Sequence, residues 1–344
     1  MLRLPGILLH EHLDGGLRPQ TVAELAGDVG HRLPVAPARL EEWFDQGRSG
    51  SLERYLAAFE HTVGVMQTRP ALERVAEEAI EDLAADGVAY AEIRFAPKLC
   101  TLRGLTGDDV LDAVLRGLER AGRRHGVMWG VIVDAMRNDP DSLPEAVMAV
   151  RWADHGVVGF DLAGPEFGYP PEAHLEAIEA AREGGLRITV HAGEAAGVDS
   201  IRSAAGVCGA ERLGHGVEII DDCRVEGGDI VDLGEVAQDV HARRIPLEIC
   251  PTSNLHTKGW PAEEHPVGML HRAGFAVTIN TDNRLMSRTS LSQEFEFLRT
   301  HHGFTAMDED VVTRTAVDAA FCDADTRARL LDLLPPVRPS GMDT

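Results

Sequence analysis

The sequence predicts an α/β fold, a (β/α)₈ barrel (TIM barrel) with extra helices inserted after its first strand. Three observations predict it: short apolar runs rich in Val and Ile recur along the chain, amphipathic stretches separate them, and the runs number eight. Strands that alternate with helices are typical of a parallel sheet, and eight such units close into a barrel. The predicted strands span residues 5–10, 87–97, 127–136, 157–164, 186–194, 211–216, 245–250 and 275–282.

The helices between the strands are predicted from apolar spacing and capping residues. Apolar residues recur at helical intervals between residues 110 and 118, and Thr106 with Asp109 forms a capping pair before them. Gly126 follows the pattern, at the place where a left-handed C-cap residue is expected. A crossover helix is therefore expected between the second and third strands.

The first connection, from about residue 14 to residue 87, is much longer than a single crossover helix requires. Because barrel active sites lie at the carboxyl ends of the strands, an insertion here is placed to roof the site. We expect residues 1–334 to form one barrel domain, with a helical lid insertion at about residues 15–86 and a loose tail at residues 335–344. Packing between helices explains the apolar residues of the insertion equally well; those available for a roof are Leu52, Leu56, Phe59 and Val63.

The composition limits the classes of function. With 44% hydrophobic and 26% charged residues, the chain can bury a large core, which excludes a disordered or coiled-coil protein. The formal net charge is −23, because 56 acidic residues outnumber 33 basic ones, and this charge would repel nucleic acids and anionic membranes. No apolar run has the length of a membrane span, no signal-peptide core or cleavage site is visible, and the five cysteines form no CxxC pair. We therefore expect a cytoplasmic protein without nucleic-acid or membrane partners.

Two histidines, His10 and His12, end the first predicted strand. Residues two apart on a strand project to the same face, so the two imidazoles converge while Glu11 points away. Such a pair is suited to binding a metal ion, although by itself it also occurs by chance on protein surfaces.

Further polar residues follow three other predicted strands. His191 and Glu194 follow the fifth strand, His215 ends the sixth, and Asp282 ends the eighth. In a barrel these strand ends meet at one rim, where catalysis takes place. Any one of these histidines alone is more simply a structural residue, but together they predict a catalytic metal site. Three imidazoles, or two with a carboxylate, and an open position for water are what catalytic zinc requires.

A single metal ion per chain is the simpler interpretation. A second ion in barrel hydrolases usually needs a bridging carboxylate or a carboxylated lysine. The chain has only two lysines, Lys98 and Lys258, and neither lies on the fourth predicted strand. One ion with one activated water is sufficient for hydrolysis.

Six short motifs follow one another along the chain, each on the expected strand end. They are HEHLDG (His10–Gly15), DLAG (Asp161–Gly164), HAGE (His191–Glu194), LGHG (Leu213–Gly216), CPTSN (Cys250–Asn254) and NTDN (Asn280–Asn283). Together these motifs resemble the adenosine deaminase family, the adenosine/AMP deaminase branch of the amidohydrolase superfamily. Each motif is weak alone, but the set is highly specific and spans nearly the whole chain.

The resemblance implies hydrolysis of adenosine and 2′-deoxyadenosine to inosine and 2′-deoxyinosine with release of ammonia, a reaction of purine salvage. It implies one Zn²⁺ ion per chain, which lowers the pKa of a bound water to about 7 and supplies hydroxide to attack C6 of the purine. Glu194 would protonate N1, His215 would stabilise the attacking oxygen, and Asp282 would accept the water's proton. The implied zinc ligands are His10, His12, His191 and Asp282.

The resemblance also assigns residues to the partner molecule, a purine nucleoside. His12 belongs to the implied substrate site, Asp14 would bond a ribose hydroxyl, and the backbone N–H of Gly164 would meet purine N3. Related adenine deaminases tend to carry Glu in place of Asp14, so this chain favours a nucleoside over a free base. Without the other motifs, an Asx-turn at Asp14 beside Gly15 is the simpler interpretation.

The chain departs from the family pattern at Asn283 and Arg284, where many members have Asp and Pro. The amide of Asn283 can still donate to purine N7. Arg284 places a cation near the rim, which would suit a carboxylated nucleoside such as 6-aminodeoxyfutalosine, unless it pairs with a nearby acid. Two alternatives therefore stand beside adenosine: deamination of such a modified purine nucleoside, and a catalytically silent nucleoside-binding homologue. The oligomeric state is not predicted.

Overall fold

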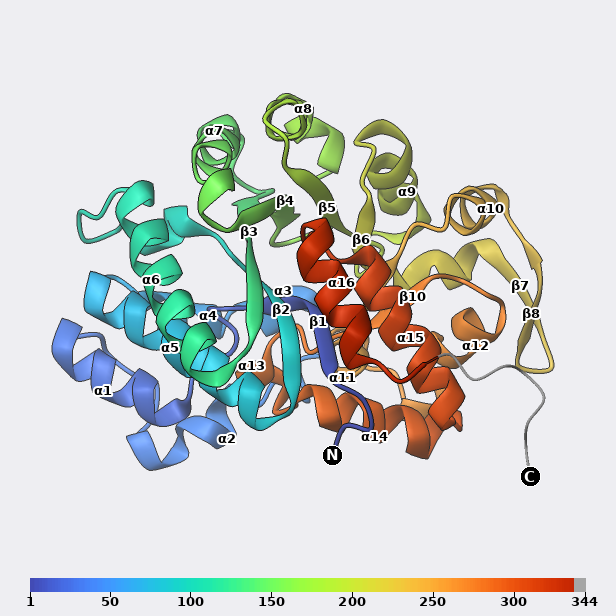
Figure 1. The fold of residues 1–344 in the computed structure, drawn as a ribbon, viewed down its shortest axis with the longest axis horizontal. Coiled ribbons are helices and arrows are strands. Elements are labelled where there is room, and N and C mark those ends of the chain that lie inside the picture. Colours follow the sequence, from blue (N-terminus) through green and yellow to red (C-terminus); the bar gives the residue numbers. More distant parts are fainter. Residues whose placement is uncertain (337–344) are drawn as a thin grey trace.

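Eight parallel strands form the centre of the structure, and helices surround them (Figure 1). The computed structural model describes residues 1–336, so most of the predicted tail lies outside the described residues. Neighbouring strands follow the order β1-β2-β3-β4-β5-β6-β9-β10, which confirms all eight predicted strands and the predicted barrel. Their bounds are β1 Gly6–His12, β2 Val88–Phe95, β3 Met128–Met136, β4 Val157–Ala163, β5 Arg187–Ala192, β6 Arg212–His215, β9 Leu247–Ile249 and β10 Val277–Ile279.

The barrel closes between β1 and the segment that follows β10. The side chain of Asn280 accepts a hydrogen bond from the N–H of Leu9 at 2.8 Å. Beyond it, the N–H of His12 donates to the carbonyl of Asp282 at 2.7 Å, and the N–H of Asp282 donates to the carbonyl of His10 at 3.0 Å. The first and last strands of the barrel therefore bring His10, His12 and Asp282 together, although 270 residues separate them along the chain.

Helices occupy the connections, and five of them lie between β1 and β2. The capping box predicted for α6 is present, since Thr106 and Asp109 each bond the other's backbone, and Gly126 ends the helix with a φ of 74°. The helices are α1 Pro19–Val29, α2 Leu40–Phe44, α3 Leu52–Leu56, α4 Phe59–Val65, α5 Arg69–Ala85, α6 Gly107–His125, α7 Leu143–Arg151, α8 Leu175–Glu183, α9 Gly197–Arg202, α10 Glu235–Ala242, α11 Pro251–Lys258, α12 Val267–Arg272, α13 Arg284–Ser287, α14 Leu291–His302, α15 Ala306–Ala319 and α16 Ala324–Leu333.

Two features of the fold are absent from the sequence prediction. A hairpin of β7 (Cys223–Glu226) and β8 (Asp229–Leu233) follows β6 and pairs only with itself. Its residues are largely exposed, so it has no buried face that would leave an apolar pattern in the sequence. Helices α15 and α16 lie across the strands in front of the view in Figure 1, and residues of α15 pack on Ile7 and Tyr90 near the amino ends of β1 and β2.

The interior of the barrel contains a network of buried charges. The guanidinium of Arg94 on β2 donates to Asp161 of β4 at 2.8 Å and to Glu248 of β9 at 2.7 Å, and all three side chains are fully buried. Arg212 of β6 pairs with Glu248 at 2.6 Å and with Glu92 of β2 at 2.5 Å. Burial alone would raise the pKa of Glu248, but the two guanidinium groups hold it well below its usual range. These charges compensate one another across four strands.

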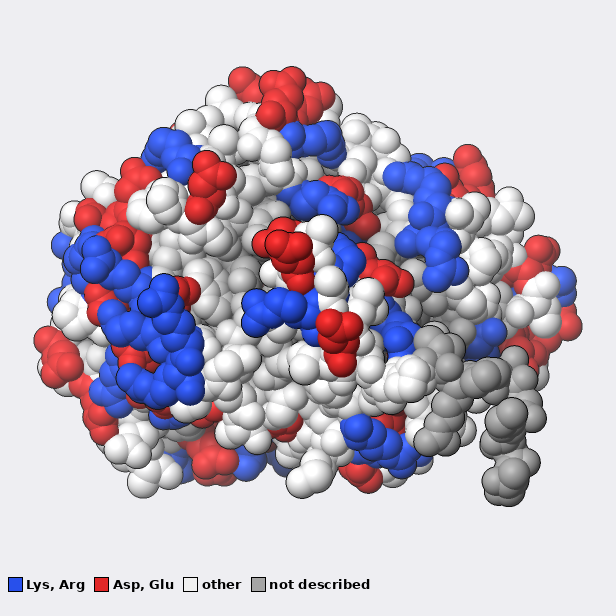
Figure 2. Space-filling model, viewed as in Figure 1, with Lys and Arg blue, Asp and Glu red and all other residues white. Residues whose placement is uncertain are grey.

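Acidic and basic side chains alternate over much of the surface seen in Figure 2. On the outer faces of α5 and α6, Arg120 pairs with Glu73 and Glu77, and Arg124 pairs with Glu81. Exposed pairs of this kind contribute little to stability. Within the described residues, none of the helices combines the length and hydropathy that a transmembrane segment would need.

Replacing Arg94 with methionine should destabilise the protein by about 3–5 kcal/mol, because it leaves the buried carboxylates of Asp161 and Glu248 without their shared cation. The free energy of unfolding can be measured by urea denaturation. Arg116→Met is the matched control, since Arg116 forms a largely exposed pair with Asp112 and should change stability by about 0.5 kcal/mol or less. Equal effects of the two substitutions would contradict the role assigned to the buried network.

Candidate active site

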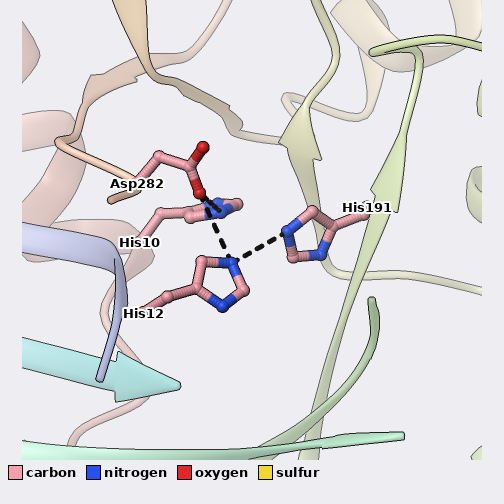
Figure 3. Close-up of side chains that lie close together, drawn as sticks. All are labelled: His10, His12, His191 and Asp282. Carbon is pink, nitrogen blue, oxygen red and sulfur yellow. Dashed lines mark hydrogen bonds and ion pairs between the residues drawn. The ribbon is translucent and has the colours of Figure 1, made fainter. Parts of the chain in front are cut away.

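Four side chains, at or just beyond the ends of three strands, meet at the carboxyl end of the barrel (Figure 3). His10 and His12 project from the same face of β1, His191 from the end of β5, and Asp282 from the segment after β10. One ligand atom of each lies within 4.8 Å of the others. The two Nε2 atoms of His12 and His191 are 3.2 Å apart, and Asp282 Oδ1 lies 3.3 Å from His10 Nε2 and 3.4 Å from His12 Nε2. The four residues predicted as metal ligands therefore converge.

This arrangement fits a metal ion better than a hydrogen-bonded cluster. Ligands about 2.0–2.1 Å from a tetrahedral zinc ion lie about 3.3 Å from one another, close to the separations seen here. The Nε2 atom of His10 is buried and makes no well-aligned hydrogen bond within the described residues. Two imidazole nitrogens facing each other, as those of His12 and His191 do, gain more from a shared cation than from a shared proton. Three imidazoles and a carboxylate are ligands that divalent transition metals accept.

Carboxylates hold the opposite nitrogen of two of the three histidines. Nδ1 of His10 lies 2.9 Å from Glu248, and Nδ1 of His191 lies 2.8 Å from Asp161. Arg94 bridges these two carboxylates, so one guanidinium supports two of the histidines. A carboxylate at Nδ1 fixes the imidazole orientation and leaves Nε2 free to bind a metal.

The backbone is strained at two residues of the site. Asp282 has a φ of 58° and His215 a φ of 63°, in the left-handed region that residues other than glycine rarely adopt. Among the described residues, only Arg244 and Arg288 share this property outside glycine. Two backbone hydrogen bonds with β1 hold Asp282 in this conformation: its N–H donates to the carbonyl of His10, and its carbonyl accepts the N–H of His12. Such strain costs about 1–3 kcal/mol and is concentrated at functional sites.

His215 and Glu194 face each other beside the cluster. His215 Nε2 lies 3.5 Å from Glu194 Oε2, and its Nδ1 lies 3.1 Å from the amide nitrogen of Asn254. Asn254 Oδ1 accepts the N–H of Cys250, so its NH₂ group points at His215 and leaves the proton of the imidazole on Nε2. Burial lowers the pKa of His215 well below its usual value, which keeps the ring neutral. Burial raises the pKa of Glu194 well above its usual value, and the nearby charge of Asp282 adds to the effect.

A cavity of about 540 Å³ opens above the cluster. Its polar floor contains the residues predicted for catalysis and substrate binding. Of the four candidate metal ligands, only His10 does not line the cavity. The roof of the cavity is apolar and comes from α3 and α4, where the hydroxyl of Tyr55 bonds Ser287 of α13 at 2.7 Å. All four apolar residues expected to roof the site line the cavity: Leu52, Leu56, Phe59 and Val63. The predicted floor residues that line it are His12, Asp14, Gly164, His191, Glu194, His215, Asp282 and Asn283.

Two of the floor residues, Asp14 and Asn283, have a buried side-chain oxygen, Oδ1, without a hydrogen-bond partner in the described chain. The N–H groups of Gly15 and Gly16 donate to backbone carbonyls rather than to Asp14, so the Asx-turn considered for Asp14 is not formed through them. Burial raises the pKa of Asp14 to about 7. Gly164 has a φ of 95°, which a larger residue would adopt only with strain.

Arg284 pairs with nearby acids, one of the two interpretations that the sequence left open, and presents no cation to the substrate. Its Nε donates to Glu11 at 2.6 Å, its Nη1 lies 3.5 Å from Asp82, and its side chain is only 10% exposed. Arg284 is absent from the cavity lining. The reason is the pleat of β1, which turns Glu11 away from the cavity and towards Arg284.

Sequence reasoning missed the charged residues that support the site. Arg94 and Glu248 lie inside predicted apolar strands, and so does Asp134, whose carboxylate is 3.5 Å from Nδ1 of His12. Asp161 was recognised only as part of a motif. One signal in the sequence could have found them. A charged residue in a strand that is buried on both faces is tolerated only when its charge is paired.

Comparison with known proteins decides the family. The family model described as "Adenosine deaminase" matches residues 5–336. The chain belongs to the adenosine deaminase family. Adenosine deaminase of Mycobacterium ulcerans is 51% identical over 337 residues, which cover 95% of this chain and 93% of that protein.

Two solved structures, one of a deaminase and one of an amidohydrolase, share the fold of this chain. Adenine deaminase from Arthrobacter aurescens superposes with a TM-score of 0.87 and 26% identity, over 96% of this chain and 98% of the other. An amidohydrolase from Burkholderia ambifaria with bound Zn superposes with a TM-score of 0.81 and 26% identity, over 96% and 89% of the two chains. The family resemblance inferred from the six motifs is therefore confirmed.

Removal of one imidazole should weaken metal binding by this family member. His12→Ala is expected to lower the affinity for a divalent ion at least about tenfold, because three ligands remain and Asp282 loses a neighbour. Metal content after dialysis, measured by atomic emission, tests this. His301→Ala is the control, since His301 pairs with Glu263 on the surface and should leave the content unchanged. Full metal content in His12→Ala would contradict the assignment.

Proposed function

We propose that this chain is a zinc-dependent deaminase that hydrolyses adenosine and 2′-deoxyadenosine to inosine and 2′-deoxyinosine, with release of ammonia. The observation that carries the proposal is the convergence of four ligand atoms on the floor of a cavity that also contains Glu194 and His215. The relative that is 51% identical over most of both chains is named adenosine deaminase, which supports the same reaction.

The residues present fit one zinc ion per chain. His10, His12, His191 and Asp282 would hold it, and a structural neighbour is described with bound Zn. When bound, zinc lowers the pKa of a coordinated water to about 7 and makes hydroxide available at neutral pH. Asp282 is oriented for a second role, because its Oδ2 accepts a hydrogen bond from Ser253 at 2.5 Å while its Oδ1 faces the histidines. In this proposal Asp282 accepts the proton of the attacking water.

Glu194 and His215 act on the substrate. The raised pKa of Glu194 keeps a proton on its carboxyl group, and the proposal transfers this proton to purine N1 as C6 is attacked. Negative charge then does not accumulate on the heterocycle. Burial keeps His215 neutral and Asn254 leaves its proton on Nε2, and we assign this N–H to stabilising the oxygen that adds to C6. The proton accepted by Asp282 then passes to N6, the C6–N6 bond breaks and ammonia leaves, and the hydroxyl at C6 returns a proton to Glu194 as the 6-oxopurine forms.

Substrate binding is assigned to three residues that line the cavity, of which Asp14 has a buried carboxylate oxygen without a partner in the described chain. We propose that Asp14 bonds a ribose hydroxyl, that the backbone N–H of Gly164 meets purine N3, and that the amide of Asn283 meets N7. Apolar residues of α3 and α4 would cover the faces of the purine and exclude water. Oligomeric state and cellular location are not part of the proposal.

Both alternatives considered from the sequence lose support. A carboxylated nucleoside was favoured only by Arg284, which instead pairs with Glu11 outside the cavity. A silent binding protein is disfavoured because Glu194, His215 and all four candidate ligands are present together, and the similar protein is named as an enzyme. Adenosine and its deoxy form remain the substrates that the cavity supports best.

Glu194→Gln should lower kcat for adenosine by about 10²- to 10⁴-fold, because the amide cannot donate an acidic proton. The rate is measured by the loss of adenosine absorbance with metal-replete protein. In the native enzyme, kcat should decline as the pH rises through the raised pKa of Glu194, since only the protonated form donates.

Metal content of Glu194→Gln is the accompanying control and should equal that of the unaltered protein, because Glu194 is not one of the four candidate ligands. Unchanged turnover in Glu194→Gln would refute its role. Failure of the native protein to hydrolyse any 6-aminopurine nucleoside would refute the proposed function.

The cavity should discriminate against nucleoside 5′-phosphates. Six carboxyl groups line it and no lysine or arginine does, with Glu53 and Glu60 exposed at its mouth. We expect kcat/KM for AMP to be at least about 100-fold lower than for adenosine. Glu60→Lys should reduce the ratio of kcat/KM for adenosine to kcat/KM for AMP by about two- to tenfold, because it places a cation at the mouth.

Glu176→Lys is the matched control for the change in net charge, because Glu176 is exposed on α8 and does not line the cavity. It should leave the ratio of the two kcat/KM values unchanged. Equal rates for AMP and adenosine in the native protein would show that charge at the mouth does not select the substrate.

A further inference from the structure

Residues 193–195, between β5 and α9, carry Glu194 into the cavity. Their three successive backbone N–H groups all donate to one side chain, the carboxylate of Glu166, which comes from the loop after β4 and is 2% exposed. Gly193 donates to Oε1 at 2.7 Å, and Glu194 and Ala195 donate to Oε2 at 2.9 and 2.5 Å. A carboxylate suits this position because it offers two acceptor oxygens and, when ionised, no donor.

The backbone of Glu218 contacts the first residue of the segment, and its side chain contacts Gly197, two residues beyond the segment. The carbonyl of Gly193 accepts the N–H of Glu218 at 2.9 Å, and the N–H of Gly197 donates to the Glu218 carboxylate at 2.5 Å. Gly193 has a φ of 75°, and a Cβ there would lie 2.4 Å from Ile201. The segment therefore follows one backbone path, along which Glu166 satisfies three N–H groups that are otherwise left without partners.

The position of the Glu194 side chain follows from this backbone path. Its carboxyl lies 3.5 Å from His215 and lines the cavity, where a substrate nitrogen would have to meet it. Proton transfer requires hydrogen-bond distance and alignment, so a displacement of about 1 Å is sufficient to slow it severely. Glu166 itself does not line the cavity and is not one of the four candidate ligands.

We propose that Glu166 is a positioning residue for deamination: by binding the N–H groups of residues 193–195, it holds Glu194 where its proton reaches the substrate. The inference rests on the proposed function, in which Glu194 is the proton donor. It assigns to a carboxylate outside the cavity a role that neither the family motifs nor the cavity lining indicate.

The charge of Glu166 acts in the same direction as its hydrogen bonds. Burial raises the pKa of Glu194, and the negative charges of Asp282 and Glu166 raise it further. A carboxylate at Glu166 therefore favours the protonated form of Glu194, which is the form that donates.

Glu166→Gln tests the role without changing the size of the side chain. Glutamine has one acceptor oxygen, so at least one of the three N–H groups must face an NH₂ group. We expect kcat for adenosine to fall about 10- to 100-fold, with KM changed less than about threefold and zinc still bound. The decline of kcat at alkaline pH should move to lower pH, and amide hydrogen exchange at residues 193–195 should become faster.

Glu218→Gln is the matched control. It makes the same chemical change in a buried carboxylate of the same region, but Glu218 bonds the N–H of Gly197 and the ammonium of Lys258, and not the N–H groups of residues 193–195. The oxygen of glutamine can still accept the bond from Gly197 while the ion pair with Lys258 is lost, so kcat should fall clearly less than in Glu166→Gln.

Three results would overturn the inference: native kcat and pH profile in Glu166→Gln, an equal loss in Glu218→Gln, or a loss that tracks zinc content. Failure of the proposed function is distinguishable, because it would show as absent deamination in the native protein. In that case hydrogen exchange decides whether Glu166 holds the segment, and unchanged protection of residues 193–195 in Glu166→Gln would exclude it.

Discussion

One guanidinium group, that of Arg94, connects the stability of the barrel to the geometry of its candidate metal site. It binds Asp161 and Glu248, and each of these carboxylates holds Nδ1 of a histidine whose other nitrogen points into the cluster. Buried carboxylates are tolerated only when they are compensated, so the cation is needed before the histidines can be oriented. The barrel interior is therefore not a purely apolar core. Its charges are neutralised across neighbouring strands, and the site lies directly above them.

The closing seam of the barrel supplies the second constraint. Backbone hydrogen bonds between β1 and the segment after β10 hold Asp282 in a left-handed conformation beside His10 and His12. The first and last strands must therefore pair before three of the four candidate ligands are in place. The strain at Asp282 is balanced by these bonds rather than by flexibility of the residue.

The sequence was sufficient for the strands and for the polar residues at the rim, because these depend on local patterns. Residues two apart on one strand share a face, and parallel strands end at one rim, so these residues could be grouped without coordinates. The family resemblance then selected His10, His12, His191 and Asp282 among them as the candidate ligands. The supporting groups depend on which strands are neighbours and on where long side chains reach. Glu166 binds backbone 27 to 29 residues away, and Arg94 spans β2, β4 and β9. The acid that pairs with Arg284 could not be named from the sequence, because Glu11 lies on the outward face of β1, about 270 positions earlier.

The roof and the floor of the cavity come from different parts of the chain. The floor is built from strand ends fixed by the barrel, whereas the apolar roof comes largely from α3 and α4 within a single connection. Changes in that connection can alter which molecules fit without disturbing the reacting groups beneath. Substitutions within this one connection, natural or engineered, can therefore change substrate specificity while the reacting groups stay the same.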